Sequence, residues 1–518
     1  MRVPSVSYLG RLPRIILTAA LLLSTGINSN FLFPDRVFAQ TAASPRPAGE
    51  AYIVPFVTKR LANGLEVIVL KDSSVPLVTV ELAVRNGSFT EPPEYHGLSH
   101  LYEHMFFKPN MAAILNECDQ RPEATLISVC RNAFSLRDQI GDTSYLRDSN
   151  KLSVYNGTTR EEIVNYYYTT TRDYLESAIK TINDSVRFPA FDPEQLEDEK
   201  KVVIGEIDRQ EANPFGFLDR ELRKRLFYKY PSRKDPMGTR ESVRAATVEK
   251  MRTIQSRYYV PNNSALIVTG DADPETVFLL AEKIMGSWKP RAVDPFKEFP
   301  LVDHPPLEKS EGLIVERPAD TLNGEGGENV FVEIGWQGPS IGKDDAATYA
   351  ADVFSYIITQ PDSRFQRNLV DTGLVASVDF GYYTQRNVGP INLVFSCRPD
   401  KVKQALAAIY REIDAFIKPN YYTDEELSAS KTILETRDLF EREKASEYAH
   451  TLGFWWSSTG IDYFKTYHQR LRAVTRADIE RYLKTYVIGK NHVAVALMTA
   501  ETRKRINLTE ADLIGGAK

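Results

Sequence analysis

Residues 58–106, TKRLANGLEVIVLKDSSVPLVTVELAVRNGSFTEPPEYHGLSHLYEHMF, place several strands ahead of a helix. Asn63-Gly64 separates two apolar, β-branched runs, which is a strong hairpin signal. The run LVTVELAVRNGS predicts a third strand that ends at Asn86-Gly87. After Gly97, apolar residues recur at helical spacing, at Leu98, Leu101 and Met105. The stretch therefore predicts strands followed by a helix, the beginning of an α+β domain.

The rest of the chain predicts that this order of elements occurs twice. In the first half, KLSVYNGTTREEIVNYYYTT predicts a strand pair, helices follow it, and NNSALIVTGD predicts a late strand. The second half repeats strand, helix, strand pair, helices and late strand, and ends at NHVAVALMT. Internal repetition of this kind predicts two similarly built domains. We assign them to residues 51–288 and 312–518, joined by a linker at 289–311 that carries five prolines.

The first residues differ in composition from the rest. Arginines precede a short apolar run at Ile15–Ile27, and VFAQ offers a cleavage site after Ala39. This pattern is typical of a secretory signal peptide at 1–39, followed by a spacer at 40–50, and the run is short for a membrane span. An uncleaved N-terminal anchor is the alternative. We expect an exported protein, secreted or periplasmic, with no stable membrane span once the signal is removed.

The overall composition is that of a globular protein. Hydrophobic residues make up 42% and charged residues 26% of the 518 residues, and the formal net charge is only -5. Without a basic field, nucleic acid is not an expected partner. Cys118 and Cys130 lie in an irregular stretch that resembles an insertion, and they either form a local disulfide in an oxidising compartment or stay unpaired. Cys397 lies in a strand-like run, where burial is expected.

HGLSHLYEHMFFKP (96–109) contains three of the seven histidines of the chain. On a helix, His100, Glu103 and His104 project from nearly one face. Two imidazoles at this spacing can occupy two corners of a tetrahedral zinc site, and the glutamate between them is placed to accept the proton of a water molecule. The H-x-x-E-H order is the inverted metallopeptidase motif. His96 precedes the helix, so we assign it to a loop outside the ligand set.

A catalytic zinc site needs a third protein ligand. The helix expected after Asp192 offers several acids: Glu197, Asp198, Glu199, Glu206, Asp208 and Glu211. Glu199 and Glu206 are two turns apart on one face, and Glu206 follows the apolar VVIG. A buried carboxylate there would need a partner such as zinc. Spacing alone favours Glu206 without deciding it.

Several motifs together resemble the pitrilysin/insulinase family of inverted-motif zinc metallopeptidases, especially its mitochondrial-processing-peptidase-like branch. They are NGLEVIVL, RNGSFTEPPEYHGLSHLYEHMFFK, EDEKKVVIGEIDRQEANPF, YYVPNNSALIVTGD and, in the second half, DSRFQRNLVDTGLVASV. The resemblance implies one zinc ion per chain held by His100, His104 and Glu206, with Glu103 as general base and Glu199 as a supporting catalytic acid. It also implies two homologous α/β sandwich domains, each a mixed or antiparallel sheet covered by helices, which form a clamshell around a peptide chamber. Asn156, in SVYNGTT, matches a polar position of the strand that pairs with extended substrate.

The sequence departs from the family pattern in two ways. The interval between His104 and Glu206 is long, and the additional residues fall in the cysteine-bearing stretch. Family members that act alone usually carry an Arg and, seven residues later, a Tyr in the second domain, but Leu369 and Ala376 stand at those positions. Arg364 and Arg367 lie nearby in a different register.

We therefore expect an exported zinc metalloendopeptidase that hydrolyses peptides or unfolded segments. Because the Arg and Tyr of the second domain are missing, we hypothesise that the chain is the active subunit of a heterodimer whose partner lacks the zinc motif. The alternative is a non-catalytic binding or assembly subunit that retains zinc, and a metal-dependent hydrolase acting on another substrate stays open.

Overall fold

The computed structural model describes residues 53–108, 110, 112, 152, 154–319 and 329–515. The expected signal peptide, Cys118 and Cys130 lie outside these residues. Ile53–Lys518 forms one compact unit. Among the described helices, none combines the length and the apolar character that crossing a membrane requires.

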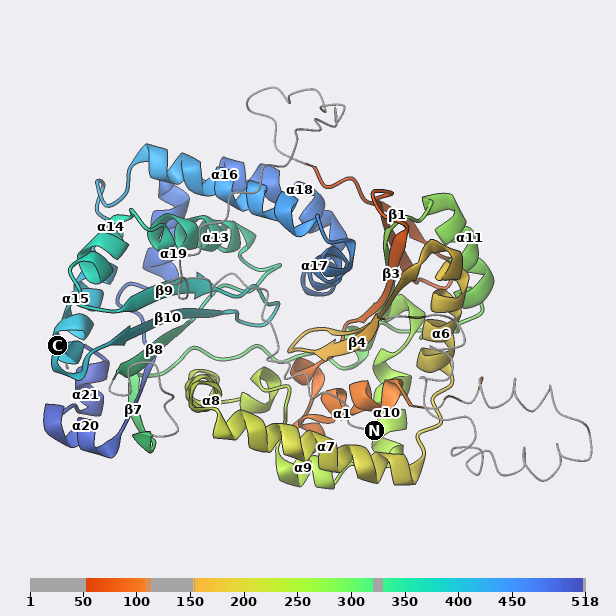
Figure 1. The fold of residues 1–518 in the computed structure, drawn as a ribbon, viewed down its shortest axis with the longest axis horizontal. Helices are drawn as coiled ribbons and strands as arrows, with labels where there is room; N and C mark the ends of the chain where they lie inside the picture. Colours follow the sequence, from red (N-terminus) through yellow and green to blue (C-terminus); the bar gives the residue numbers. More distant parts are fainter. Residues whose placement is uncertain are drawn as a thin grey trace, which may run out of the picture. The chain divides into compact units, whose positions relative to one another are not determined.

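The first sheet has six strands in the order β1-β2-β6-β3-β5-β4. Figure 1 labels β1, β3 and β4 of this sheet. Their bounds are β1 Val57–Arg60, β2 Glu66–Lys71, β3 Leu77–Val84, β4 Val154–Thr159, β5 Val164–Thr171 and β6 Ser264–Gly270. β2 and β6 are parallel and the other neighbours are antiparallel. The predicted hairpin and third strand are confirmed as β1, β2 and β3, and β4 forms one edge of the sheet.

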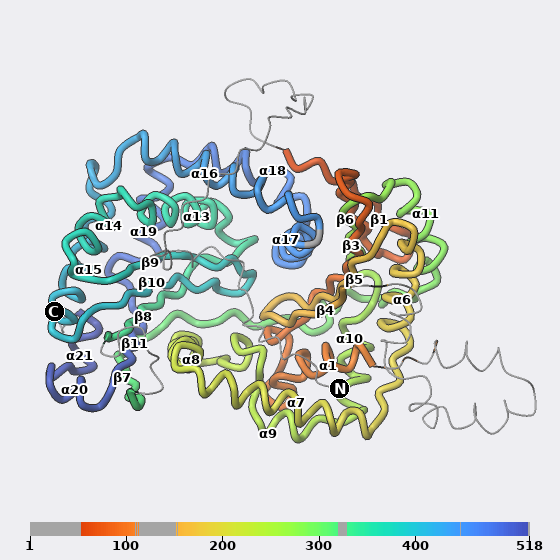
Figure 2. The backbone as a smooth tube through the Cα atoms, in the orientation of Figure 1, coloured from red at the N-terminus to blue at the C-terminus, as the bar shows by residue number. Residues whose placement is uncertain are grey.

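The second sheet has the order β7-β11-β8-β10-β9, and Figure 2 shows β11 beside β7 and β8. Its strands are β7 Glu311–Glu316, β8 Val330–Gln337, β9 Ser377–Tyr382, β10 Pro390–Cys397 and β11 Val493–Met498. β7 and β11 are parallel, and the other neighbours are antiparallel. The order therefore repeats that of β2-β6-β3-β5-β4. The α+β class with two mixed sheets is confirmed, while the clamshell chamber stays a prediction.

Helices accompany both sheets. In the first half they are α1 Leu98–Phe106, α6 Leu175–Arg187, α7 Pro193–Ala212, α8 Pro214–Leu226, α9 Arg240–Arg244, α10 Val248–Tyr258, α11 Pro274–Met285 and α12 Pro295–Glu298. In the second half they are α13 Asp345–Thr359, α14 Arg364–Gln366, α15 Val402–Ala415, α16 Asp424–Glu441, α17 Ala445–Ser458, α18 Ile461–Ala473, α19 Arg476–Tyr486, α20 Ala500–Ile506 and α21 Glu510–Leu513.

The sequence predicts the start of α7 correctly. Asp192 Oδ1 accepts hydrogen bonds from the backbone N–H groups of Glu194 (2.8 Å) and Gln195 (3.0 Å), and Pro193 is the first helical residue. By contrast, the pattern of SVRAATVEKMRTIQSRYY (242–259) predicts one helix, and this prediction is wrong. The segment is divided into α9 and α10, because Thr247 lies outside the helix and its side chain caps a new one by accepting from Lys250 N.

Two helices pack on the sheet of the opposite half (Figure 1). α8 packs on β8 and β11, where Leu218, Leu222 and Leu226 join one apolar cluster with Val493 and Val495. In the reciprocal arrangement, α17 packs on β3 and β6. The two halves thus each contribute a helix to the other, so the core of each half is completed by the other half.

Candidate metal centre

α1 carries the histidine pair on a helix that is firmly anchored in the core. Leu101, Tyr102 and Met105 are buried on its inner face, and the Tyr102 ring stacks on Tyr259 with 4.1 Å between ring centroids. At its start, the Glu91 carboxylate accepts hydrogen bonds from Gly97 N (2.7 Å) and Ser99 N (2.6 Å), which satisfies helix N–H groups that otherwise have no partner. The orientation of the opposite face is therefore fixed.

That opposite face brings His100 and His104 together with Glu206 of α7. One ligand atom from each lies within 4.8 Å of the others, and within the described residues this is the group that could hold a metal ion. Glu206 Oε2 lies 3.5 Å from Nε2 of His100 and 3.5 Å from Nε2 of His104. Two imidazole nitrogens and one carboxylate oxygen are a donor set that suits zinc.

Glu199, seven residues before Glu206, lies behind His104 rather than among the three ligand atoms. Its Oε2 lies 2.9 Å from His104 Nδ1, and its Oε1 lies 2.6 Å from Lys108 Nζ. A carboxylate that accepts the Nδ1 proton leaves the Nε2 lone pair of His104 directed toward Glu206.

Glu103 is buried between α1 and the edge strand β4. Its Oε2 accepts a hydrogen bond from Thr159 Oγ1 at 3.0 Å. A Cβ added at Gly157 would lie 2.7 Å from Glu103 Oε1, so only glycine leaves room for the carboxylate at this position of β4. The base candidate and the exposed edge of the sheet are therefore adjacent.

Burial and neighbouring charges shift the titration of these groups in the metal-free protein. Burial raises the pKa of Glu103 to about 7. Burial, with the nearby His104, lowers the pKa of His100 to about 4. Burial also acts to lower the pKa of His104, but the contacts with Glu199 and Glu206 outweigh it and raise that pKa to about 10. A cation would therefore replace a proton held between His104 and two carboxylates.

Comparison with known proteins agrees with this arrangement. The model of "Insulinase (Peptidase family M16)" matches residues 66–140 and 143–239, and that of "Peptidase M16 inactive domain" matches residues 245–434. The chain belongs to peptidase family M16. It is a homologue of zinc proteases and carries a His/His/Glu group that could hold a metal ion. The resemblance inferred from the sequence is confirmed at the level of the family, and the branch within it stays a prediction.

Individual M16 relatives align over most of the chain. The zinc protease PqqE of Helicobacter pylori is 21% identical, over 84% of this chain and 91% of that protein. A crystal structure of a protease from Helicobacter pylori superposes with a TM-score of 0.70 at 18% identity, covering 86% of this chain and all of that chain. The periplasmic protease PqqL from Escherichia coli gives a TM-score of 0.66 at 15% identity, covering 92% of this chain and 50% of that one. At these identities the two structural matches show a shared fold.

His96 lies before α1 and takes part in a different set of contacts. Its Nε2 lies 3.0 Å from the backbone oxygen of Asp235, and the Asp235 carboxylate pairs with Arg220 Nη2 at 2.9 Å. This histidine therefore connects the loop before α1 to the segment that follows α8, as expected for a residue outside the ligand set.

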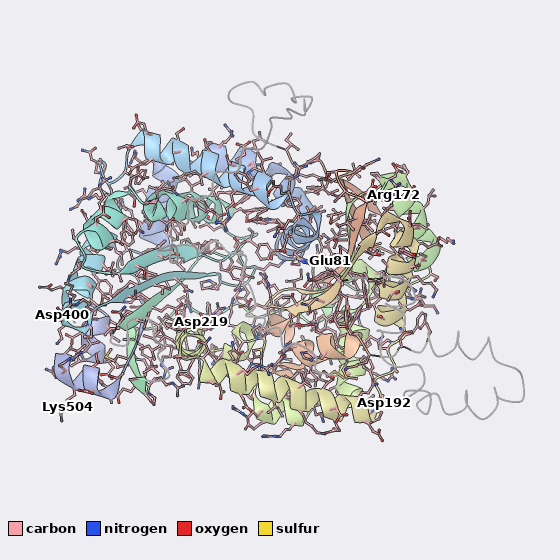
Figure 3. All side chains as sticks on the ribbon, in the orientation of Figure 1. Glu81, Arg172, Asp192, Asp219, Asp400 and Lys504 are labelled. Atoms are coloured by element: carbon pink, nitrogen blue, oxygen red, sulfur yellow. The ribbon has the colours of Figure 1, made fainter. Side chains whose placement is uncertain are left out.

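Asn156 lies on edge strand β4, but its side chain is on the other face of the sheet from Glu103. Asn156 is paired with Tyr167 and Tyr167 with Glu81, and directly opposed residues share a face. That face is covered by α17, whose His450 contacts the ring of Tyr167 and the carboxylate of Glu81. Figure 3 labels Glu81 beside α17. The backbone of β4, rather than the Asn156 amide, is the part of this strand that is adjacent to Glu103.

The second half has no side-chain donor at Leu369 or Ala376, the two positions where the family resemblance predicts Arg and Tyr. Leu369 is fully buried, and Ala376 is exposed with a methyl side chain. The two nearby arginines are used locally, since Arg364 lies over the Tyr421 ring and Arg367 donates to the backbone oxygen of Asp362. Both side chains thus make contacts within the second half.

Sequence reasoning missed Lys108, Gly157 and Thr159 as neighbours of the centre. Lys108 follows His104 by one helical turn, so its spacing was a usable signal. Gly157 and Thr159 gave no such signal, because only the packing of β4 against α1 brings them to Glu103.

Proposed function

We propose that this chain is an exported zinc metalloendopeptidase that hydrolyses peptides or unfolded segments. The observation that carries the proposal is the convergence of ligand atoms of His100, His104 and Glu206 within 4.8 Å. The buried Glu103 directly precedes His104 on the same helix. Membership of a family of zinc proteases supports the same reaction class.

The chemistry of the donor set fits zinc. The two Nε2 atoms face a single carboxylate oxygen, and the cluster also contains the carboxylates of Glu103 and Glu199, so a divalent cation would balance a local excess of acid. When bound, zinc supplies a Lewis acid that polarises the scissile carbonyl and makes water more acidic. We assign the three ligands to His100, His104 and Glu206.

Glu103 is the proposed general base. Its carboxylate accepts the proton of the attacking water and then delivers that proton to the leaving amine nitrogen. Thr159 holds the carboxylate by a 3.0 Å hydrogen bond, so the base is oriented before substrate binds. Glu199 orients His104 and stays ionised, because its contacts with His104 and Lys108 outweigh burial and keep its pKa below the usual value.

An extended peptide is the proposed substrate, with β4 as the strand to which it adds. Strand addition uses main-chain hydrogen bonds and therefore gives weak sequence selectivity. β4 is the edge of its sheet and is adjacent to Glu103, which supports a scissile bond near that edge. Because the Asn156 side chain faces away from Glu103, we propose that Asn156 contacts the bound peptide through its backbone, within a closed chamber formed with the second half.

Export is proposed on the signal-like residues 1–39, and it accords with the periplasmic source of one structural relative. Because Leu369 and Ala376 supply no oxyanion donor, we further propose that an M16-like partner lacking the zinc motif provides it. The lack of an oxyanion donor at Leu369 and Ala376 also favours the second candidate function, a zinc-retaining subunit without catalysis.

Metal exchange tests the proposed function. Removal of zinc with a chelator should abolish cleavage of a mixture of quenched peptides, and about one equivalent of zinc per chain should restore it. Peptide cleavage that persists in metal-free protein would refute the proposal.

A further inference from the structure

A cavity of about 140 Å³ lies away from the metal centre, where three parts of the chain meet. Arg85 and Phe89 come from the end of β3 and the segment after it, Phe296 and Leu301 from α12 and beyond, and Arg386 and Ser457 from the second half. The residues that line it include two arginines and no acid. None of them takes part in the metal centre described above.

The two guanidinium groups lack an ionic partner. Within the described part of the chain, neither Arg85 nor Arg386 forms a salt bridge, and Arg85 Nε is buried without a hydrogen-bond acceptor. Arg85 Nη2 donates to the backbone oxygen of Trp456 at 3.1 Å, and Arg386 Nε donates to that of Ser458 at 2.8 Å. Carbonyl oxygens orient these side chains but do not neutralise them.

Two nearby acids, Glu162 and Asp294, attract these arginines without forming an ion pair with them, and both carboxylates accept backbone hydrogen bonds. The Glu162 carboxylate accepts from the backbone N–H groups of Arg386 (2.8 Å) and Asn387 (3.1 Å). The Asp294 carboxylate caps α12 by accepting from Phe296 N (2.8 Å). Burial, together with the positive charge of Arg386, lowers the pKa of Arg85 to about 10, although Glu66 and Asp294 act in the opposite direction.

The walls and the size of the cavity limit what could neutralise this pair. Phe89 and Phe296 pack with 5.6 Å between ring centroids and, with Leu301, give an apolar wall that strengthens electrostatic attraction. The volume is below the roughly 300–1,000 Å³ typical of pockets for drug-sized ligands. Guanidinium groups bind carboxylate and phosphate oxygens in a planar, two-pronged geometry.

We propose that this cavity binds a small oxyanion, a phosphate or a carboxylate, between Arg85 and Arg386. Because one arginine follows β3 and the other lies between β9 and β10, the anion links the two halves of the chain. Its role is to stabilise their association, independently of peptide hydrolysis.

Calorimetric titration of the zinc-loaded protein tests this site. Inorganic phosphate and 3-phenylpropionate are the two probes, at ionic strength held constant with chloride. Phosphate binding alone would assign a free inorganic anion, and tighter binding of the phenylpropionate would assign an organic carboxylate with an apolar group. Saturable binding should also raise the midpoint of thermal unfolding by a few degrees, since a ligand of the folded state stabilises it.

Arg386→Gln should abolish binding of the preferred probe, and Arg386→Lys, which keeps the charge without the planar fork, should weaken it at least about tenfold. The control is Arg398→Gln, because Arg398 is exposed and paired with Asp400, and it should bind as the wild type does. Phosphate bound at the metal would be unaffected by any of these changes. The proposal is overturned if neither probe binds saturably, or if Arg386→Gln binds as tightly as the wild type.

Discussion

Glu199 Oε2 lies 2.9 Å from His104 Nδ1, while Glu206 Oε2 lies 3.5 Å from His104 Nε2. The same imidazole is therefore contacted by two acids of α7 on its two nitrogens, and the two acids have different predicted roles. One would bind the metal and the other would orient a ligand that does.

Glu206→Gln and Glu199→Gln should separate these roles. Glu206→Gln removes a charged ligand and should lose stoichiometric zinc after dialysis. Glu199→Gln should retain zinc with an affinity reduced about 10- to 100-fold, the usual effect of removing a partner of a ligating histidine. Zinc content after dialysis measures the retention of zinc, and competition with a chromophoric chelator measures the zinc affinity. Equal zinc affinity in the two variants would contradict the assignment.

Gly157→Ala should reduce turnover without removing zinc. The added Cβ would lie 2.7 Å from Glu103 Oε1, so either the carboxylate or β4 has to move. We expect at least a tenfold loss of kcat, since small displacements of a catalytic group are costly, on the order of 100-fold for 1 Å. Peptide cleavage and zinc content are measured together.

Gly205→Ala is a matched control for that variant. Gly205 directly precedes Glu206, but an added Cβ would meet only Arg209 Nη1, at 3.9 Å. The variant should keep zinc and activity, and should raise the free energy of unfolding by about 0.5–1 kcal/mol, because alanine is the better helix former. A loss of activity as large as that of Gly157→Ala would mean that any added methyl near the centre is harmful.

Asp352 should make stability depend on pH. Burial raises its pKa to about 7 in the folded protein, and its partner is the hydroxyl of Tyr467, which donates to Oδ2 at 2.7 Å. The folded state therefore holds a proton that the unfolded chain, with a pKa near 3.8, releases. The stability that the protonated Asp352 contributes is therefore fully present below about pH 4 and is lost as the pH rises through about 7.

Asp352→Asn isolates this effect, since asparagine keeps an acceptor for Tyr467 and does not titrate. The free energy of unfolding of the wild type, relative to the variant, should fall by about 2–4 kcal/mol between pH 4 and pH 7. Urea unfolding at several pH values measures the difference. A difference that is constant with pH would show that Asp352 is ionised throughout.

The proposed partner subunit predicts weak activity of the isolated chain. Leu369 and Ala376 offer no oxyanion donor, and loss of one such donor typically costs about 100- to 1,000-fold in kcat. Purified chain should therefore show trace turnover that rises when an M16-like partner is added. Full activity of the purified chain would exclude the heterodimer and would require a donor from elsewhere in this chain.

The sequence predicts local structure well where a local cause is sufficient. Asp192-Pro193 begins α7 because capping and a preset backbone angle act within a few residues, and the spacing of His100 and His104 follows from the helix itself. The repeat of strands and helices was likewise visible as an alternation of periodicities. The prediction of two similarly built α+β domains rests on these local signals, whereas the sheet type was implied only by the family resemblance.

The exchange of α8 and α17 between the halves was not predicted. An amphipathic pattern shows that a helix has an apolar face, but not which sheet that face covers, and only the packing of Leu222 against β8 and β11 decides this. β7 was missed because EGLIVE is short and contains a glycine. Gly157 and Thr159 were missed as neighbours of Glu103 for the reason that also hid the packing of α8. In both cases the contact joins segments that are distant in the sequence.

Peptide turnover by zinc-loaded Glu103→Gln tests the role of Glu103 as general base. Glutamine keeps the shape of the side chain and an acceptor for Thr159, but it cannot accept the proton of water. We expect the variant to hold about one zinc ion per chain, as in the wild type, with turnover of quenched peptides reduced to background. Unchanged turnover at full zinc occupancy would show that Glu103 is not the base of a zinc peptidase.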